Sequence, residues 1–417
     1  MEIGRDKYLD ALKIRMHNGM IKVITGIRRC GKSYLVFHIF KNYLLESGVD
    51  QEHIIAIELD QRKNKELRDP DKILNYIDNQ IVDDKQYYIL LDEVQMLDDF
   101  EEVLNSLLHI SNVDVYVTGS NSKFLSKDII TEFRGRGDEI HIYPLSFKEF
   151  MEAYDGDQYR GWADYITYGG LPLTVTMKTE EQKIVYLSTL FDETYIKDII
   201  ERNRIERIQE LNDLINVLAS SIGSLSNPKK IEATFKSVIG SNISINTIRK
   251  YIEYLKDAFV ITEAQRYDVK GRKYIGSPVK YYFEDIGLRN ARLGFRQVEE
   301  THIMENIIYN ELRMRGFQVD VGVVQKRERA ESGEFKKKQL EVDFIASLGS
   351  KKYYIQSAYS LPDSEKIKQE KASLMGINDS FKKIIIVKDV INVRHDDDGV
   401  EYINIYDFLL KDNSLEL

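Results

Sequence analysis

The chain has 417 residues, enough for two or three domains, with 43% hydrophobic residues, 30% charged residues and a formal net charge of −9. This acidic balance excludes a protein that coats nucleic acid through bulk charge, although it leaves room for a local basic face. The longest apolar runs have the length of one strand, whereas a membrane span needs roughly 20 residues, so no membrane association is expected.

Two further features bear on the compartment. Residues 1–8 are charged and have no apolar core, so we expect no secretory signal. Cys30 is the single cysteine, which excludes an internal disulfide and argues against a cysteine-based zinc site. We therefore expect a cytoplasmic protein.

Short apolar segments alternate with helical patterns through residues 1–147. The expected strands are residues 21–25, 54–59, 87–91 and 113–118, and the expected helices are residues 33–47 and 73–82. The strands are continuous apolar runs, which is typical of strands buried on both faces of a parallel sheet. Alternation of strand and helix implies right-handed crossovers and therefore an α/β fold with a doubly wound parallel sheet.

The link between the first strand and the first helix, Gly26–Ser33, reads GIRRCGKS and fits the pattern G-x-x-x-x-G-K-[ST] in full. Its glycines allow backbone N–H groups to wrap around phosphate oxygens, and the following helix directs its positive end at the same anion. Lys32 is expected to neutralise the β- and γ-phosphates of ATP, and the Ser33 hydroxyl to bind Mg²⁺. A chance match in a turn is the alternative, and the flanking strand and helix argue against it.

The nucleotide contacts are expected from the whole loop and the first turn of its helix. At the variable positions only the backbone is needed, so Cys30 is interpreted as a spacer rather than as a redox-sensitive thiol. The expected nucleotide-binding residues are Gly26, Ile27, Arg28, Arg29, Cys30, Gly31, Lys32, Ser33 and Tyr34. The predicted cofactors are thus ATP and Mg²⁺.

The third expected strand ends in the acidic pair Asp92 and Glu93. Asp92 is predicted to hold Mg²⁺, directly or through water, and Glu93 to polarise the attacking water. An apolar strand followed by a polar turn is common by itself. Downstream of a complete phosphate loop, it indicates the second half of an ATP site.

Polar and basic residues follow the fourth expected strand. Ser120 or Asn121, in the segment VTGSNS, is predicted to contact the γ-phosphate or the water, because polar residues at strand carboxyl ends face the ligand crevice. The alternative is an ordinary turn. Arg134 or Arg136 is predicted to reach the γ-phosphate of a neighbouring subunit, which requires a homo-oligomer. A solvated or ion-paired arginine is the alternative.

Taken together, the segments GIRRCGKS, LLDEVQ, VTGSNS, RGR, PLSFKEF and YGGLP resemble a group of prokaryotic AAA-family ATPases. The resemblance covers nearly the whole chain: residues 2–205 look like the ATPase region, and the rest looks like the domain of unknown function usually fused to it. It implies ATP binding and hydrolysis, with a P-loop NTPase core over residues 1–147 and a helical lid over residues 148–205.

Residues 206–290 read as three amphipathic helices and a β-hairpin around the basic turn Lys270–Lys273, the pattern of a winged helix-turn-helix. In this interpretation Ser244–Lys256 is the recognition helix, and Asn246, Arg249 and Lys250 point toward a DNA groove. The alternative is a packing module between domains, because acidic residues lie on or near the same helix.

Residues 291–417 resemble the restriction-endonuclease-like α/β fold, in which a helix Glu, a strand Asp and an [E/Q]-x-K tripeptide bind Mg²⁺ and activate water. The resemblance assigns these positions to Glu305, Asp343 and Gln356–Ala358, and Ala358 stands where the lysine belongs. We therefore expect a degenerate domain, with Glu305 and Asp343 as a candidate second metal site. Lys352 or its neighbour Lys351 is a candidate replacement for the missing lysine.

Several interpretations of the whole chain stay open. ATP hydrolysis drives a conformational change that the C-terminal half reads out on DNA, or the ATP state controls exposure of that half to a protein partner. In the second case the nuclease-like domain is only a binding module. A metal-dependent nuclease under ATPase control is a third interpretation. The charged segment Lys326–Lys338 is expected to be a solvated loop rather than a nucleic-acid patch.

Overall fold

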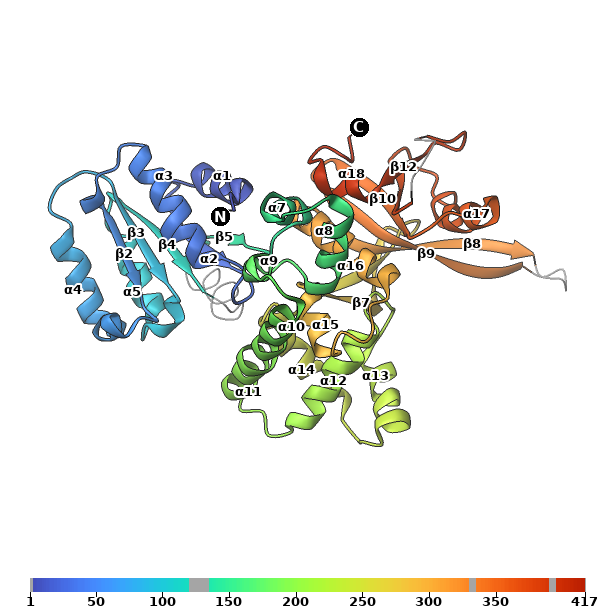
Figure 1. Cartoon of the computed structure of the whole chain (residues 1–417), viewed down its shortest axis with the longest axis horizontal. Helices are drawn as coiled ribbons and strands as arrows, with labels where there is room; N and C mark the ends of the chain where they lie inside the picture. Colours follow the sequence, from blue (N-terminus) through green and yellow to red (C-terminus); the bar gives the residue numbers. More distant parts are fainter. Residues whose placement is uncertain (1–2, 120–134, 330–334, 390–394, 417) are drawn as a thin grey trace. The chain divides into compact units, whose positions relative to one another are not determined.

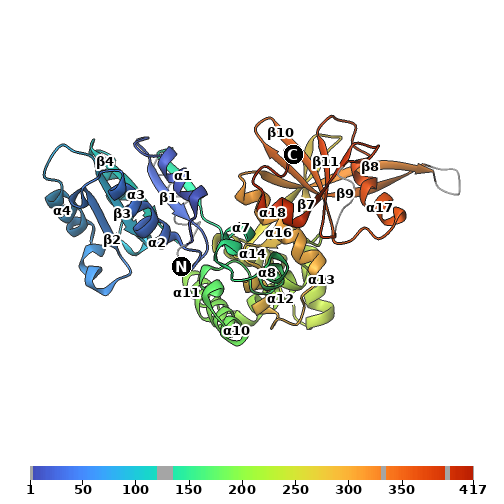
Figure 2. The same ribbon diagram turned by 45° about the horizontal axis from the view of Figure 1, so that its top comes forward.

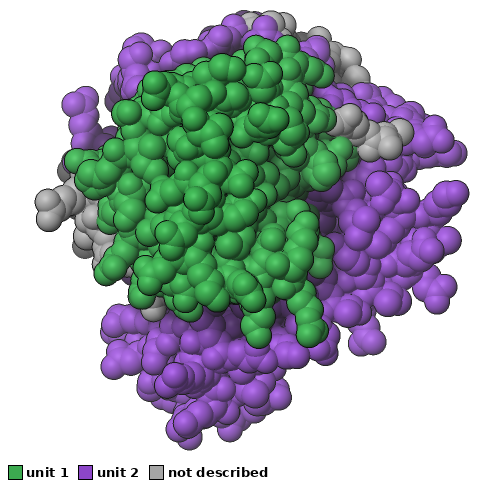
Figure 3. All heavy atoms as spheres, turned by 90° about the vertical axis from the view of Figure 1, so that its left-hand side faces the viewer, with its two compact units in different colours: residues 1–144, 257–259 green, residues 145–256, 260–417 purple. Residues whose placement is uncertain are grey.

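The computed structural model describes residues 3–119, 135–329, 335–389 and 395–416 (Figures 1 and 2). The chain divides into two compact units, coloured separately in Figure 3: residues 1–144 with 257–259, and residues 145–256 with 260–417. Each unit has its own sheet and core. None of the helices in the described ranges combines the length and the apolar character that a bilayer crossing requires.

The first unit is built on a five-stranded sheet with the strand order β2-β3-β4-β1-β5. Its strands are β1 (Ile21–Thr25), β2 (Ile54–Glu58), β3 (Tyr87–Asp92), β4 (Val113–Thr118) and β5 (Gly137–His141). Its helices are α1 (Asp6–Ile14), α2 (Lys32–Tyr34), α3 (Lys41–Glu46), α4 (Pro70–Gln80) and α5 (Phe100–Leu107), and the π-helical segment Leu35–Phe40 joins α2 to α3. Every strand pair is parallel, so the predicted parallel α/β core is confirmed.

Helices cover both faces of this sheet, which explains why its strands are apolar throughout. On one face Ile89 of β3 packs in a cluster with Ile77 of α4 and Leu104 of α5. On the other face the ring of Tyr116, from β4, lies 4.6 Å from the ring of Phe40 in the helix that follows β1. The carboxyl ends of the parallel strands therefore meet at one edge of a fully packed layer.

A buried ion pair joins the two central strands near their amino ends. The Lys22 ammonium of β1 pairs with Asp114 of β4, and their side chains are 0% and 4% exposed. Asp114 also accepts hydrogen bonds from the Tyr116 hydroxyl at 2.8 Å and from the His17 amide at 3.1 Å. Burial lowers the pKa of Lys22, and Asp114 opposes this shift by hydrogen bonding and by its charge.

The second unit is built on a seven-stranded sheet with the order β12-β11-β10-β9-β8-β6-β7. Its strands are β6 (Ile261–Asp268), β7 (Lys273–Phe283), β8 (Gln318–Arg329), β9 (Phe335–Leu348), β10 (Lys351–Ala358), β11 (Lys382–Val387) and β12 (Val400–Asn404). Its first helices are α7 (Phe147–Ala153), α8 (Gln158–Tyr168), α9 (Pro172–Thr176), α10 (Glu180–Thr189), α11 (Lys197–Asn203), α12 (Ile208–Ser220), α13 (Pro228–Thr234) and α14 (Ile245–Asp257). The remaining helices are α15 (Ile286–Arg292), α16 (Glu300–Met314), α17 (Ser364–Leu374) and α18 (Ile405–Leu410).

One sheet connects the hairpin predicted as a wing to the strands predicted for the last domain. The strand β6 pairs antiparallel with β7 and parallel with β8. The strand β9 is antiparallel to both β8 and β10, whereas β10, β11 and β12 are parallel. The winged helix, the nuclease-like fold and the boundary at residue 290 stay predictions.

The structure corrects the prediction of a charged loop over Lys326–Lys338. The strand β8 continues to Arg329 and β9 begins at Phe335, so most of this segment is a long antiparallel hairpin. The ladder hydrogen bonds use backbone groups only, so a high density of charged side chains does not prevent strand pairing.

Helices pack on both faces of the second sheet. On one face Leu374 of α17 joins Tyr354 and Ile385 in a buried cluster. On the other face Tyr309 of α16 stacks on Tyr282 of β7, with ring centroids 4.3 Å apart. The two helices thus enclose the centre of the mixed sheet.

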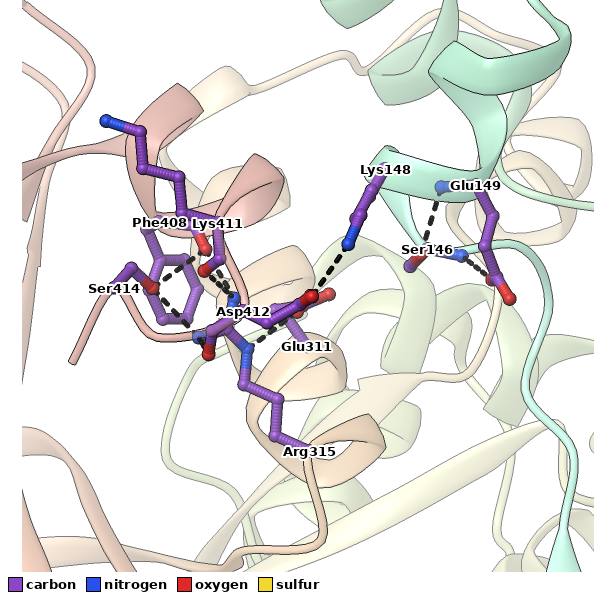
Figure 4. A network of polar contacts seen from close by, with 9 residues as sticks. All are labelled: Ser146, Lys148, Glu149, Glu311, Arg315, Phe408, Lys411, Asp412 and Ser414. Atoms are coloured by element: carbon purple, nitrogen blue, oxygen red, sulfur yellow. Dashed lines mark hydrogen bonds and ion pairs between the residues drawn. The ribbon is translucent and has the colours of Figure 1, made fainter. Parts of the chain in front are cut away.

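Polar contacts fasten the C-terminal segment to α7 and α16 (Figure 4). Arg315 donates hydrogen bonds to the carbonyl oxygen of Phe408 and, at 2.8 Å, to Oγ of Ser414. Lys148 of α7 pairs with Asp412 at 2.7 Å. Residues near both ends of the second unit are therefore joined.

Candidate active site

The loop between β1 and α2 follows a backbone path that requires glycine. Gly26, Arg29 and Gly31 have positive φ angles of 137°, 65° and 103°. A Cβ atom at Gly26 would lie 2.1 Å from the carbonyl oxygen of Ile142. The Ile142 amide donates to the carbonyl oxygen of Thr25 at 2.8 Å, which fixes Ile142 beside the loop. The loop thus leaves β1 at the carboxyl edge of the sheet with no space for a larger residue.

The side chain of Lys32 lies inside the curve of this loop. It is 5% exposed, and its Nζ donates to the carbonyl oxygens of Gly26 and Ile27 at 2.9 Å each. The ammonium is therefore fixed where a bound phosphate would meet it. Among the other predicted positions, Cys30 is buried, Arg28 is half-buried, and Arg29 and Tyr34 are exposed.

The structure brings the two predicted Mg²⁺ residues together. Oγ of Ser33 donates to Oδ1 of Asp92 at 3.0 Å, and the hydroxyl of Thr118 donates to the same oxygen. Asp92 is 3% exposed, and burial raises its pKa while the hydrogen bonds from Thr118 and Ser33 oppose that shift. Thr118 ends β4, which lies between β1 and β3, and was not among the residues predicted for this site.

Glu93 is held next to Asp92 by hydrogen bonds to its backbone and to its side chain. Its φ of 50° lies in the left-handed region, which is uncommon for residues other than glycine. Its amide donates to Oγ1 of Thr118 at 3.1 Å, and its carboxylate accepts a hydrogen bond from the side chain of Gln95. The predicted water-polarising carboxylate is therefore positioned from both its backbone and its side chain.

Two acidic residues that were not predicted from the sequence lie beside Asp92. Glu58, which ends β2, and Asp60 each place a carboxylate oxygen within 4.8 Å of the others and of an oxygen of Asp92. Carboxylate oxygens are ligands that Mg²⁺ accepts directly or through its waters. In the sequence these residues form the acidic end of the second expected strand. This position indicates a place in the site only when β2 is known to pair with β3.

Of the remaining predicted residues, the structure describes Arg136. Ser120, Asn121 and Arg134 lie outside the described residues. Arg136 is exposed, and its carbonyl oxygen accepts a hydrogen bond from the amide of Ile21, at the amino end of β1. A strand of five residues separates that end from the loop, which corresponds to about 16 Å. Arg136 thus lies at the opposite edge of the sheet from the phosphate loop of its own chain.

In the second unit, Glu305 of α16 and Asp343 of β9 come together around Lys280 of β7. Nζ of Lys280 lies 2.8 Å from Oε1 of Glu305, 3.6 Å from Oδ1 of Asp343 and 2.7 Å from Oε1 of Glu341. Tyr282 donates its hydroxyl to Oε1 of Glu305 at 2.6 Å. Burial alone would lower the pKa of Lys280. The charges of the three carboxylates have the opposite and larger effect, so the pKa of Lys280 lies above its usual value.

The tripeptide position is next to this centre. The amide of Ser357 donates to Oδ2 of Asp343 at 2.9 Å, whereas Ala358, in place of the missing lysine, is buried in the apolar cluster. Burial, and then the charge of Glu305, raise the pKa of Asp343 to about 7, against the effect of Lys280. The candidate replacements lie elsewhere, because Lys351 pairs with Glu416 and Lys352 lies over the ring of Phe381.

Comparison with known proteins yields two family models and two relatives that match along most of the chain. A model described as an AAA domain matches residues 18–151, and a domain of unknown function (DUF8612) matches residues 159–299. An uncharacterized protein of Haemophilus influenzae is 33% identical over 417 residues, covering 98% of this chain and 99% of its own. An uncharacterized protein of Methanocaldococcus jannaschii is 30% identical over 415 residues, covering 95% of this chain and 87% of its own.

Similarity to solved structures is low. The structure of the Aeropyrum pernix ORC1 protein in complex with DNA is 12% identical and covers 70% of this chain and 92% of that chain, with a TM-score of 0.30. A similarity of this size supports no statement about function.

Proposed function

Because the chain belongs to the same family as the uncharacterized Haemophilus influenzae protein and its residues 18–151 match an AAA domain, we propose that it binds ATP with Mg²⁺ at the Gly26–Ser33 loop and hydrolyses it to ADP and phosphate. The observation that carries the proposal is the buried ammonium of Lys32 inside the loop, next to the pair formed by Ser33 and Asp92 at 3.0 Å. A loop of backbone donors, a fixed cation and an oxygen pair for a divalent ion is what a triphosphate with Mg²⁺ requires.

Each side chain at the site has one role in this proposal. Lys32 neutralises the β- and γ-phosphates, and Ser33 and Asp92 hold Mg²⁺, which offsets the charge that develops on the phosphates. Glu58 and Asp60 lie within reach of waters on that ion. Glu93 accepts a hydrogen bond from the attacking water and so orients it.

Two further roles concern residues outside this group. Asn121, or Ser120 beside it, contacts the γ-phosphate or the attacking water. Arg134 or Arg136 serves the site of a neighbouring subunit, which is consistent with the distance of Arg136 from its own loop. The mass of the particle with and without ATP tests whether a homo-oligomer forms, and a monomer under both conditions would contradict the arginine role.

Three variants test the site. Lys32→Ala should abolish nucleotide binding, and Glu93→Gln should bind ATP as the parent does but hydrolyse it at least 100-fold more slowly. Lys72→Ala, on the exposed side of α4, is the matched control for loss of a positive charge and should leave both measurements unchanged. Parent-rate hydrolysis by Glu93→Gln would show that another group orients the water.

We propose DNA as the target that the C-terminal half reads out. The support is the exposure of Asn246, Arg249 and Lys250 on α14 and of the basic turn Lys270–Lys273 between β6 and β7. ATP turnover should rise with duplex, forked or single-stranded DNA, and binding should weaken steeply with salt. If DNA changes neither, the alternative becomes an ATP-dependent switch for a protein partner, which the Glu93→Gln variant should retain in a pull-down.

A further inference from the structure

A buried cluster of charges in the second unit has no part in the proposed ATPase reaction. It consists of the Lys280 ammonium and the carboxylates of Glu305, Glu341 and Asp343. Nζ of Lys280 lies 2.7 Å from Glu341, 2.8 Å from Glu305 and 3.6 Å from Asp343. One cation on β7 is thus surrounded by three carboxyl groups from α16 and β9.

The cluster is fixed as well as buried. The side chain of Lys280 is 3% exposed and those of Glu305 and Asp343 are 10% and 11% exposed, whereas that of Glu341, at the edge of the cluster, is 33% exposed. The hydroxyl of Tyr282 donates to the Glu305 oxygen that Lys280 also contacts. Behind this carboxylate lies Gly223, where a Cβ atom would be 3.1 Å from Oε1. Charges buried to this degree are maintained only when each has its partner.

The metal that the nuclease-like interpretation implies does not fit this arrangement. Mg²⁺ lies about 2.1 Å from its oxygen ligands. An ion on Oε1 of Glu305 would compete with Nζ of Lys280, which contacts the same oxygen, and like charges repel strongly in a buried setting. Of the residues that the structure describes, Glu58, Asp60 and Asp92 bring ligand oxygens within 4.8 Å of one another, and the carboxylates around Lys280 do not.

We propose that the Lys280 ammonium is the resident cation of this centre, in the place of a divalent metal, and that removing it creates a site for Mg²⁺ or Mn²⁺. In the native chain the ammonium compensates the negative charge of the carboxylates, which would otherwise be available as metal ligands. The second unit therefore cuts no DNA by a metal-dependent reaction at Glu305 and Asp343. Without the ammonium, the negative charge of these carboxylates is no longer compensated, and the volume that the ammonium occupied becomes free. A hard divalent cation needs both.

The test uses Mn²⁺ binding to the full chain, measured by electron paramagnetic resonance without nucleotide. Every sample carries Asp92→Asn, which disables the acidic ligand of the other site, so the result does not depend on the proposed ATPase function. Lys280→Met keeps an unbranched side chain that is one atom shorter and loses the charge, and Lys280→Arg is the matched control that keeps the charge. Lys280→Met should bind Mn²⁺ at least 100-fold more tightly than Lys280→Arg or the protein with Lys280, and adding Asp343→Asn should abolish that binding.

Equal Mn²⁺ affinity with and without the Lys280 charge would overturn the proposal. So would Mn²⁺ binding by the protein with Lys280 that Asp343→Asn abolishes, or Mn²⁺-dependent cleavage of DNA that the same substitution removes. The last two measurements need no change at residue 280, so they decide the question when Lys280→Met does not fold.

Discussion

Replacing Gly26 by alanine tests the phosphate loop without removing a charged group. The added Cβ would lie 2.1 Å from the carbonyl oxygen of Ile142, which itself is fixed by the hydrogen bond to Thr25. To reach ordinary van der Waals contact, the loop and Ile142 must separate by more than about 1 Å in a close-packed region. In addition, the φ of 137° at Gly26 is one that L side chains rarely adopt.

These two effects set the expected magnitude. The backbone strain costs about 1–3 kcal/mol, and overpacking against Ile142 adds about 1–3 kcal/mol. The loop can relieve the contact by moving, but its amides and Lys32 then leave the positions that phosphate oxygens require. A displacement of about 1 Å at a binding site costs on the order of 100-fold, so we expect at least a 100-fold loss of ATP affinity, or about 2.7 kcal/mol.

Titration with a fluorescent ATP analogue and thermal unfolding of the same samples measure both effects. Gly19→Ala is the matched control, because Gly19 also has a positive φ, of 71°, but nothing lies within 4 Å of its Cβ position. It should cost about 1–2 kcal/mol of stability and leave nucleotide affinity unchanged. If folded Gly26→Ala binds the analogue within threefold of the parent, the contact with Ile142 does not determine the position of the phosphate loop.

Three further predictions concern stability. Asp114→Ala leaves the buried Lys22 ammonium without its carboxylate and should lower the free energy of unfolding by about 3–5 kcal/mol in a denaturant titration. Burial raises the pKa of Asp285 to about 6, against hydrogen bonds from backbone amides such as that of Leu288. The folded pKa exceeds the unfolded one, so the stability that Asp285 contributes is full below about pH 4 and is lost as the pH rises through 6. As the pH rises from 4 to 7, the free energy of unfolding of the Asp285→Asn variant should therefore increase by about 3 kcal/mol relative to that of the parent. Arg315→Ala removes the hydrogen bonds to Phe408 and Ser414 and should expose the C-terminal segment to limited proteolysis, at a cost of about 2–4 kcal/mol.

Each of these has its own check. Asp78→Ala, at an exposed position of α4, should change the free energy of unfolding by less than about 0.5 kcal/mol. If Asp78→Ala and Asp114→Ala lower it equally, burial of the ion pair with Lys22 does not account for the effect at Asp114. If the free energies of unfolding of the parent and of Asp285→Asn differ by the same amount from pH 4 to 7, the raised pKa assigned to Asp285 is wrong. Equal proteolysis of the parent and of Arg315→Ala would show that other contacts hold the C-terminal segment.

The parts of the site that lie on one local segment were predicted from the sequence. The loop Gly26–Ser33 and the pair Asp92 and Glu93 each combine an apolar strand with the polar residues that follow it, so their spacing along the chain carries the information. The parallel core was predicted for the same reason, because strands buried on both faces are apolar throughout.

The residues that were missed depend on which strands are neighbours. Thr118 reaches Asp92 because β4 lies between β1 and β3, and Glu58 reaches it because β2 pairs with β3. Lys280 is the clearest case, because it precedes Glu305 and Asp343 in the chain on a strand assigned to another domain. Its contacts arise because side chains of α16 and β9 meet the Lys280 ammonium of β7 in the folded chain, although β6 and β8 lie between β7 and β9 in the sheet, and spacing in the sequence contains no trace of them.

The continuous sheet of the second unit limits how the chain can be divided for biochemical work. A fragment that ends at residue 290 would keep β6 and lose β8, leaving a row of backbone groups that invites aggregation. The same cut would leave Lys280 as a buried charge with no counter-ion. Expression trials of the C-terminal half should therefore start at residue 145 and keep both parts of the sheet, and an insoluble 206–290 fragment should not be taken as evidence against a DNA-binding role.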